Sequence, residues 1–236
     1  MANELAELLT APARSTDEVV NRMRAIDAVL PLPDGVAWFN KLYLRTTENV
    51  LTAVGEGFFK HPEFMTRLDV IFANLYFDAL GASLQDPDRM PRAWRPLFAQ
   101  RARRGIAPIQ FAIAGMNAHI NRDLAVAVVS TCKEMKVRPA TGLKRDFDLV
   151  NPLLQSTQDE VKEWFATGFV GLLDQVFGRL DDVLANWSIG RARDAGWVNS
   201  LLLWELRNKG VLRAAFLQNL DHTVGFAGRG LLLPTV

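Results

Sequence analysis

The chain has 236 residues, of which 49% are hydrophobic and 22% charged, and its formal net charge is +1. A chain of this size buries enough apolar surface to fold as one domain without disulfides or structural metal. The balanced charge gives no reason to expect nucleic acid as a partner. The only cysteine, Cys132, excludes an internal disulfide and fits a reducing compartment.

The beginning of the chain, MANELAELLTAPARSTDE, does not resemble a secretory signal, because it carries acidic residues where such a signal needs basic ones. No uninterrupted apolar segment approaches the roughly 20 residues that span a bilayer. We therefore expect no membrane span and a cytoplasmic location.

Helical patterns dominate the first half of the chain. Ser15 and Glu18 form the capping-box pattern ahead of apolar positions at helical spacing, which predicts a helix up to Leu30. A second helix is predicted at residues 36–59, and a third after Pro62, which suits a first helical position. A loop then leads into a short helix that ends near residue 104, and a long helix runs from residue 108 to residue 135.

The segment at about 136–156 is the least regular part of the sequence, and we interpret it as a mobile cover or a surface linker. Helical patterns resume at residues 157–187, at 191–210 and again toward the C-terminus. No alternation of apolar and polar residues persists long enough to predict a sheet. The sequence therefore predicts an all-α fold, a single-domain helical bundle at residues 1–236 with about seven to eight helices around a central apolar helix.

The long helix at residues 108–135 is apolar almost all round, which predicts that other helices surround it. Asn117 and Asn121 lie one turn apart on its face richest in leucine, isoleucine and valine. Because a buried amide without a partner costs roughly 1–3 kcal/mol, we expect a partner or a ligand to meet both amides. Asn117 and Asn121 are therefore candidate substrate-binding residues.

His119 and Asp123 lie on nearly the opposite side of the same helix, also one turn apart. Their spacing suits a histidine base oriented by a carboxylate, and it equally suits two ligands of one divalent metal ion. Pairs at this spacing also occur on ordinary helix surfaces. His119 and Asp123 are thus the candidate catalytic residues, and the pattern leaves a structural role open.

Asp69 lies on an apolar helix, and Tyr76 follows two turns later on the same side. A buried carboxylate needs a partner, and Arg67, Arg45 or His119 would serve. A structural ion pair explains Asp69 without any function. A role in a site is the alternative, because charged residues are seldom buried without a partner or a function. We include Asp69 and Tyr76 among the candidate substrate-binding residues.

Several familiar motifs are missing from the sequence. It has no Gly-x-Ser-x-Gly elbow, no phosphate-binding Gly-x-x-x-x-Gly-Lys loop and no dinucleotide fingerprint, so no nucleotide cofactor is indicated. Neither the His-Glu-x-x-His zinc motif nor the Glu-x-x-His of di-iron bundles occurs. The other two histidines, His61 and His222, are most simply a helix-start residue and a packing or capping residue.

Five segments carry a resemblance to a known family: LYLRTTENV, RLDVIFANLYFDAL, WRPLF, PIQFAIAGMNAHINRDLAVAVV and LDHTVGFAGRGLLLP. Together they resemble an uncharacterised bacterial family, common in actinobacteria, catalogued as domain of unknown function 5995. The resemblance runs from about Met23 to Pro234, and its most specific element is AHINRDL. It implies that His119 and Asp123 matter, but it implies no reaction.

Three functions remain open. The first is an enzyme that acts on a small, largely hydrophobic metabolite by His/Asp acid–base chemistry, whether isomerisation, cyclisation, dehydration or hydrolysis. The second is an enzyme that holds one divalent metal ion on His119 and Asp123. The third is a non-catalytic ligand-binding or interaction module in which the polar helix residues are simply satisfied inside the fold. The sequence leaves the oligomeric state open.

Overall fold

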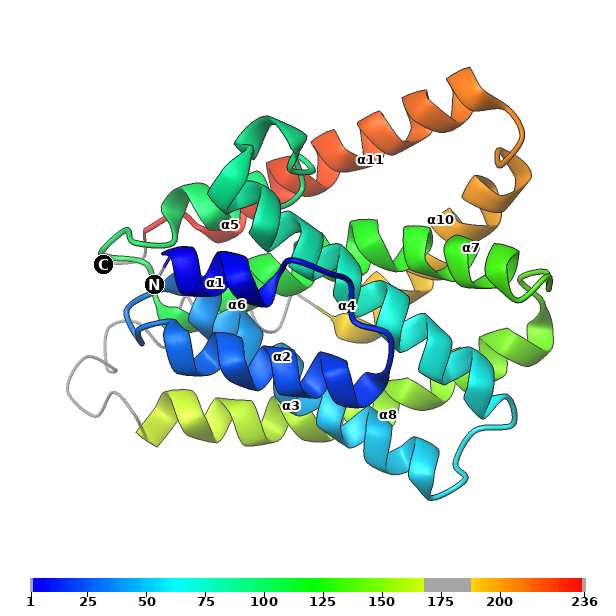
Figure 1. Ribbon diagram of the computed structural model, residues 1–236, viewed down its shortest axis with the longest axis horizontal. Helices are drawn as coiled ribbons and strands as arrows, with labels where there is room; N and C mark the ends of the chain where they lie inside the picture. Colours follow the sequence, from blue (N-terminus) through cyan, green and yellow to red (C-terminus); the bar gives the residue numbers. More distant parts are fainter. Residues whose placement is uncertain (1, 168–187, 235–236) are drawn as a thin grey trace.

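The computed structural model describes residues 2–167 and 188–234, and every regular element within these ranges is helical (Figure 1). The all-α prediction is therefore confirmed for the described part of the chain. Residues 168–187 of the helix predicted at 157–187 lie outside it. The helices are α1 (Ala2–Leu8), α2 (Thr16–Val29), α3 (Gly35–Gly55), α4 (Pro62–Gln85), η1 (Pro87–Arg89), α5 (Arg95–Gln100), α6 (Pro108–Ala118), η2 (His119–Asp123), α7 (Leu124–Glu134), α8 (Thr141–Thr167), α10 (Ile189–Glu205) and α11 (Gly210–Leu231).

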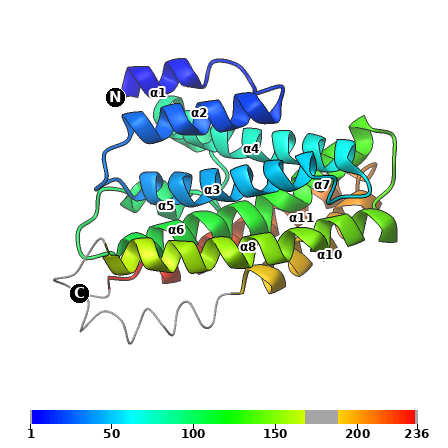
Figure 2. The same cartoon turned by 90° about the horizontal axis from the view of Figure 1, so that it is seen from below.

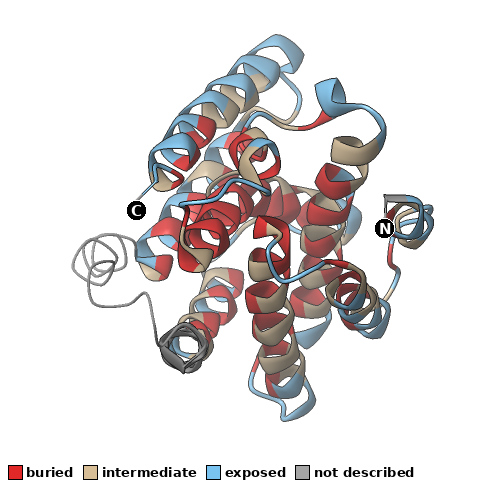
Figure 3. Cartoon of the chain, turned by 90° about the vertical axis from the view of Figure 1, so that its left-hand side faces the viewer, coloured by how far each residue is buried: buried red, intermediate tan, exposed pale blue. Residues whose placement is uncertain are grey.

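The central apolar helix is present as a continuous rod made of α6, η2 and α7. Helices α3, α4, α10 and α11 pack along the rod, while α1 and α2 lie on one side of the bundle and α8 on another (Figures 1 and 2). Buried residues concentrate on the rod and on the faces turned toward it (Figure 3). The rod is thus enclosed by its neighbours, as its apolar composition predicts.

Two helix starts follow local sequence signals. The Ser15 hydroxyl accepts a hydrogen bond from the Glu18 N–H at 3.2 Å, and the Glu18 carboxylate in turn accepts one from the Arg14 N–H at 2.8 Å. Pro62 is the first residue of α4. Both arrangements satisfy or remove N–H groups that a helix start leaves free, so these starts are encoded locally.

The prediction of a less regular segment at about 136–156 is wrong for most of its length, because α8 begins at Thr141. Gly142 and Pro152 obscure the pattern, yet four apolar side chains recur at helical spacing and are buried. A proline inside a helix costs about 3 kcal/mol, whereas each large apolar side chain contributes roughly 1.5–3 kcal/mol on burial. The free energy gained by burying these side chains is therefore larger than the cost of the proline. The four side chains are Leu143, Phe147, Val150 and Leu154.

None of the helices in the described ranges combines the length and the apolar character that crossing a lipid bilayer requires.

Candidate functional site

The rod departs from α-helical geometry at η2, a π turn that spans His119–Asp123. The N–H of Leu124 bonds to the carbonyl of His119, five residues back, instead of four. Single π turns inside α-helices are rare and are frequently found at functional sites. Helices α4, α10 and α11 all contact this turn. The two candidate catalytic residues are therefore its first and last residues.

The imidazole of His119 is completely buried among aromatic rings. It stacks on Phe72 with 3.5 Å between ring centroids and 7° between planes, and the ring of Tyr43 lies 4.5 Å away, nearly edge-on. Phe39 fits beneath the rod only because position 115 is glycine: an added Cβ there would lie 2.3 Å from the Phe39 ring. The packing fixes the orientation of the imidazole.

Asp123 is the hub of the hydrogen bonds at this site, and its side chain has no exposure to solvent. One oxygen, Oδ2, accepts from the Trp94 indole at 2.8 Å and lies 3.1 Å from His119 Nδ1. The other, Oδ1, accepts from Arg122 at 2.7 Å, and Arg122 also bonds to Asp221 at 3.2 Å. Burial alone would raise the pKa of Asp123, but the hydrogen bonds with His119 and Arg122 and the Arg122 charge hold it below its ordinary value.

The state of His119 follows from these contacts. Burial lowers its pKa below the ordinary value, and the opposing effect of Asp123 does not restore it, so the ring is neutral near pH 7. An ionised carboxylate can only accept hydrogen bonds, so the proton of the neutral ring is on Nδ1. The other nitrogen, Nε2, then carries a free lone pair, and it has no hydrogen-bond partner among the described residues.

A cavity of about 60 Å³ lies beside His119. Helices α3, α4, α8 and the rod form most of its wall, which is largely apolar. Two residues of this wall carry a buried side-chain atom without a hydrogen-bond partner in the described part of the chain, Asp69 at Oδ2 and His119 at Nε2. The Tyr43 and Thr47 hydroxyls on the same wall are close enough to interact with each other.

Asp69 forms none of the ion pairs expected from the sequence. Arg67 instead makes two hydrogen bonds to Glu134, at 2.7 and 2.8 Å. The residue as a whole is partly exposed, but Oδ2 is shut off from solvent, and burial raises the pKa of Asp69 to about 7. Asp69 therefore exchanges a proton near neutral pH beside the same cavity as His119.

Asn117 and Asn121 lie on the other side of the rod. The Asn117 amide donates to the Val224 carbonyl of α11 at 3.0 Å, and its oxygen accepts from the Asn121 amide at 3.0 Å. Neither residue lines the cavity. The partners of the two amides are thus the backbone of α11 for Asn117 and the Asn117 side chain for Asn121. The geometry therefore gives both residues a structural role in place of the predicted substrate binding.

Tyr76 is also part of the packing. It is fully buried, its hydroxyl donates to Asn40 at 3.3 Å, and Asn40 in turn donates to the Met23 carbonyl at 3.0 Å. Its ring stacks on Trp94 at 5.7 Å. Tyr76 does not line the cavity, and it stands behind the aromatic shell of His119. The substrate-binding role predicted for it has no geometric support.

The three histidines do not converge. His61 lies at the start of α4 with its Nδ1 2.8 Å from Asp146, and His222 contacts Arg92 at an exposed position. Within residues 2–167 and 188–234, no three histidine, cysteine, aspartate or glutamate side chains are close enough together to hold a metal ion. The described residues therefore offer no third protein ligand to accompany His119 and Asp123.

Sequence reasoning missed three residues of the site, Tyr43, Thr47 and Trp94. The resemblance segments contained a signal for them: LYLRTTENV holds Tyr43 and Thr47, and WRPLF holds Trp94. The glycine-rich segment LDHTVGFAGRGLLLP also contributes to the surroundings of the π turn. Its Asp221 bonds to Arg122, and its Val224 carbonyl accepts a hydrogen bond from Asn117 on the rod. The resemblance segments thus meet around η2.

In the part of the chain that the structure describes, the fold and the site define an all-helical protein with a buried histidine–aspartate pair at a π turn, beside a small cavity lined by residues with unpartnered polar atoms. The chain belongs to the family described as "Family of unknown function (DUF5995)", whose sequence model matches residues 16–234. The resemblance carried by the five segments is therefore confirmed. We found no match to the chain among curated proteins or among solved structures.

Proposed function

We propose that this protein is a cytoplasmic enzyme that catalyses proton transfer on a small, largely hydrophobic molecule in the cavity beside η2. The supporting observation is that His119 and Asp69 line one cavity and that each carries a buried polar atom without a hydrogen-bond partner in the described part of the chain. An unpaired buried polar atom costs roughly 1–3 kcal/mol, so two of them at one place need an explanation. A polar group of a substrate that enters beside these atoms would pair with them.

His119 is the proton acceptor in this proposal. Its Nε2 lone pair is free, its neutral state is favoured by burial, and its orientation is fixed by Phe72 and by the hydrogen bond to Asp123. Asp123 is a positioning residue. Its lowered pKa keeps it ionised, so it stabilises the proton on Nδ1 and would stabilise the imidazolium that forms when Nε2 takes up a second proton.

Asp69 is the proton donor. A carboxyl group with a pKa of about 7 is still largely protonated just below neutral pH, whereas an ordinary aspartate is not. A neutral base and a neutral acid on one cavity wall can remove a proton from a substrate and deliver another without first forming a buried charge. Tyr43 adds a hydroxyl donor for a substrate oxygen, since burial raises its pKa well above the ordinary value and keeps it protonated.

The size of the cavity limits what it admits. A volume of about 60 Å³ holds a few water molecules, whereas pockets for whole ligands usually measure about 300–1,000 Å³. With this volume the cavity has room only for the reacting group of a substrate. Entry of a larger molecule requires apolar wall side chains such as Met65 and Leu154 to move. The apolar wall favours a substrate that is hydrophobic around its reacting group.

A non-catalytic ligand-binding module is the second candidate. The small cavity and the tightly stacked imidazole favour it, because a histidine packed at 3.5 Å against Phe72 also serves to fill the core. The two functions differ in one respect, which is whether the bound molecule is converted.

Isosteric substitutions separate these functions. His119→Asn keeps a donor near the Nδ1 position for Asp123 and removes the base at Nε2, and Asp69→Asn removes the acid. His61→Asn is the matched control, because His61 also bonds to an aspartate through Nδ1 but lies outside the cavity. Each purified protein is incubated with a small-molecule extract of the organism that encodes it, and mass spectrometry follows which compounds disappear and which appear.

The proposal expects the wild type and His61→Asn to convert the same compound, and His119→Asn and Asp69→Asn to lose at least about 100-fold of that rate, the usual contribution of an acid or a base. Thermal denaturation checks that the variants are folded. A compound that copurifies with the protein without conversion would favour the binding module. Equal conversion by folded His119→Asn and wild type would refute the acid–base role.

A further inference from the structure

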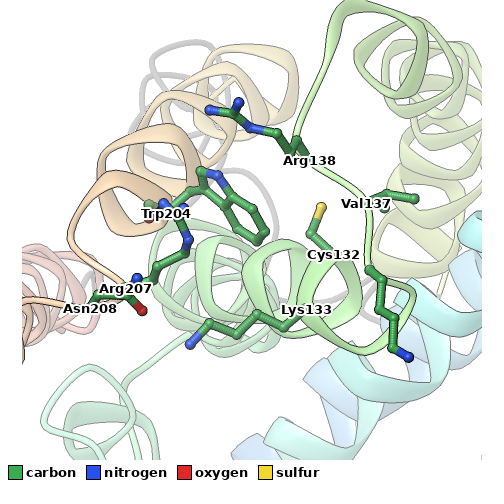
Figure 4. Close-up of a pocket in the computed structure, with 8 residues that line it drawn as sticks. Cys132, Lys133, Val137, Arg138, Trp204, Arg207 and Asn208 are labelled. Atoms are coloured by element: carbon green, nitrogen blue, oxygen red, sulfur yellow. Dashed lines mark hydrogen bonds between the residues drawn. The ribbon is translucent and has the colours of Figure 1, made fainter.

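A second hollow, of about 450 Å³, opens where α7 and α10 end side by side (Figure 4). It is far from the π turn, since Cys132 on its wall lies 13 residues along the rod from His119, or about 20 Å at the usual helical rise. Figure 4 shows Trp204 reaching from α10 toward Cys132. Arg138 lies on one side of the indole, and Lys133 and Arg207 lie on the other.

The charge of this hollow is one-sided. Its lining includes four cationic side chains, and no aspartate or glutamate is among the described residues that line it. Part of this charge offsets the negative ends of α7 and α10, but two helix ends amount to only about one negative charge together. The neighbouring Glu134 is bonded to Arg67. Among the described residues a surplus of roughly three positive charges therefore remains. The cations are Lys133, Lys136, Arg138 and Arg207.

Two of the lining side chains are held in place. The Arg207 guanidinium lies 4.5 Å above the Trp204 ring and donates to the Trp204 carbonyl at 2.7 Å. The Trp204 side chain is itself buried, with 9% of the residue exposed, yet its indole Nε1–H has no hydrogen-bond partner among the described residues. A buried donor without a partner is rare, so the indole of Trp204 is an unusual feature of this wall.

Lys136 occupies a backbone position that normally selects glycine. Its φ of 57° is in the left-handed region. At this end of α7 the Lys136 N–H donates a hydrogen bond to the Lys133 carbonyl, and the Val137 N–H donates one to the Cys132 carbonyl. Helices that end in this pattern usually carry glycine at the left-handed residue, since a side chain there is strained. The strained residue supplies one of the four cations of the hollow, and strain of this kind concentrates at functional sites.

We propose that this hollow binds the phosphate group of an anionic ligand. Guanidinium groups pair with phosphate oxygens through two parallel hydrogen bonds, and lysines add point charges. The volume is within the range of small-molecule pockets. The phosphate can come from a soluble phosphorylated molecule or from the headgroup of an anionic lipid, which present the same chemistry to these residues.

Titration calorimetry with inorganic pyrophosphate tests this site on the full chain. The variants Lys136→Gly and Arg138→Gln each remove one cation, and Lys136→Gly is expected to fold at least as well as the wild type because it relieves the left-handed strain. The matched control is the double substitution Lys41→Gln/Arg104→Gln, which removes two cations outside the hollow. Sedimentation with phosphatidylglycerol vesicles, compared with phosphatidylcholine vesicles, tests the lipid source.

We expect saturable pyrophosphate binding that is weakened at least about threefold by each single variant and at least tenfold by the two combined, while the control retains wild-type affinity. Binding to phosphatidylglycerol but not to pyrophosphate, with the same dependence on Lys136 and Arg138, also supports the site and identifies its source as lipid. Absence of binding to both probes overturns the proposal. An equal loss in the control does so too, because it would show attraction by net charge alone.

Discussion

Replacing Asp69 by asparagine should make the protein more stable at neutral and alkaline pH, although it changes only one polar atom. The carboxyl oxygen Oδ2 is buried without a hydrogen-bond partner in the described part of the chain, and burial raises the pKa of Asp69 to about 7. Asparagine has nearly the same shape as the protonated carboxyl group and carries no charge at any pH. The variant therefore avoids the unfavourable free energy of burying a charged carboxylate beside the cavity.

The size of the effect follows from the pKa. In the unfolded chain the pKa of Asp69 is near its ordinary value of 3.8, and in the folded protein it is about 7. Because each tenfold change in protonation corresponds to about 1.4 kcal/mol, the charged carboxylate lowers the free energy of unfolding by about 4 kcal/mol at pH 8. The residue is partly exposed, so screening by solvent makes this an upper value.

Because the pKa of Asp69 is raised on folding, the loss of stability occurs between its unfolded and folded pKa values. Between pH 3.8 and 7 the folded protein binds a proton at Asp69 that the unfolded chain releases, so stability falls as the pH rises through this range. Well below pH 3.8 the carboxyl group is protonated in both states and contributes no difference. Urea denaturation at pH 4, 6 and 8 should thus show the smallest difference between Asp69→Asn and wild type at pH 4, with the variant increasingly the more stable at pH 6 and 8.

Asp88→Asn provides the control, because it makes the same chemical change at a side chain that is fully in contact with solvent and does not line the cavity beside His119. If Asp69→Asn and the wild type differ by the same amount at pH 4 and pH 8, the carboxylate is solvated within the cavity, and Asp69 is not the acid that the proposed function requires.

Three further substitutions test the structure around the site and the second hollow, each by chemical denaturation. Gly115→Ala should lower the free energy of unfolding by about 1–3 kcal/mol, because the new methyl group meets the Phe39 ring at 2.3 Å. Trp94→Phe should lower it by about 2 kcal/mol, because a hydrogen bond to the buried, ionised Asp123 is lost. Lys136→Gly should raise it by about 1 kcal/mol, because glycine adopts a φ of 57° without strain.

Each of these substitutions has a control or an opposing outcome. Gly81→Ala should stabilise the protein by up to about 1 kcal/mol, since an added Cβ there is 3.9 Å from Leu9 and alanine favours helix. Wild-type stability of Gly115→Ala would mean that Phe39 is not tightly packed beneath the rod. No loss in Trp94→Phe would mean that the Asp123 hydrogen bonds are redundant. Destabilisation by Lys136→Gly would show that the lysine side chain supports the end of α7.

Local signals predicted much of the fold. Ser15 and Glu18 mark the start of α2, Pro62 marks the start of α4, and the apolar composition of residues 108–135 predicts an enclosed helix; all three are found in the structure. These features depend on groups within one turn of the chain or on the solubility of one helix face. Residues 141–154 escaped prediction because Gly142 and Pro152 are poor helix formers by themselves, and only burial against the bundle compensates for them.

The sequence by itself determined that the protein is helical and that the polar residues at 117–123 lie in an apolar helix, because both follow from local periodicity. Only the tertiary structure decided which of those residues faces a cavity. A hydrogen-bond partner that is 29 or 107 residues away, as Trp94 is from Asp123 and Val224 from Asn117, leaves no trace in local periodicity. His119 thus keeps a free nitrogen while Asn117 does not, because the first faces α3 and α4 and the second faces α11.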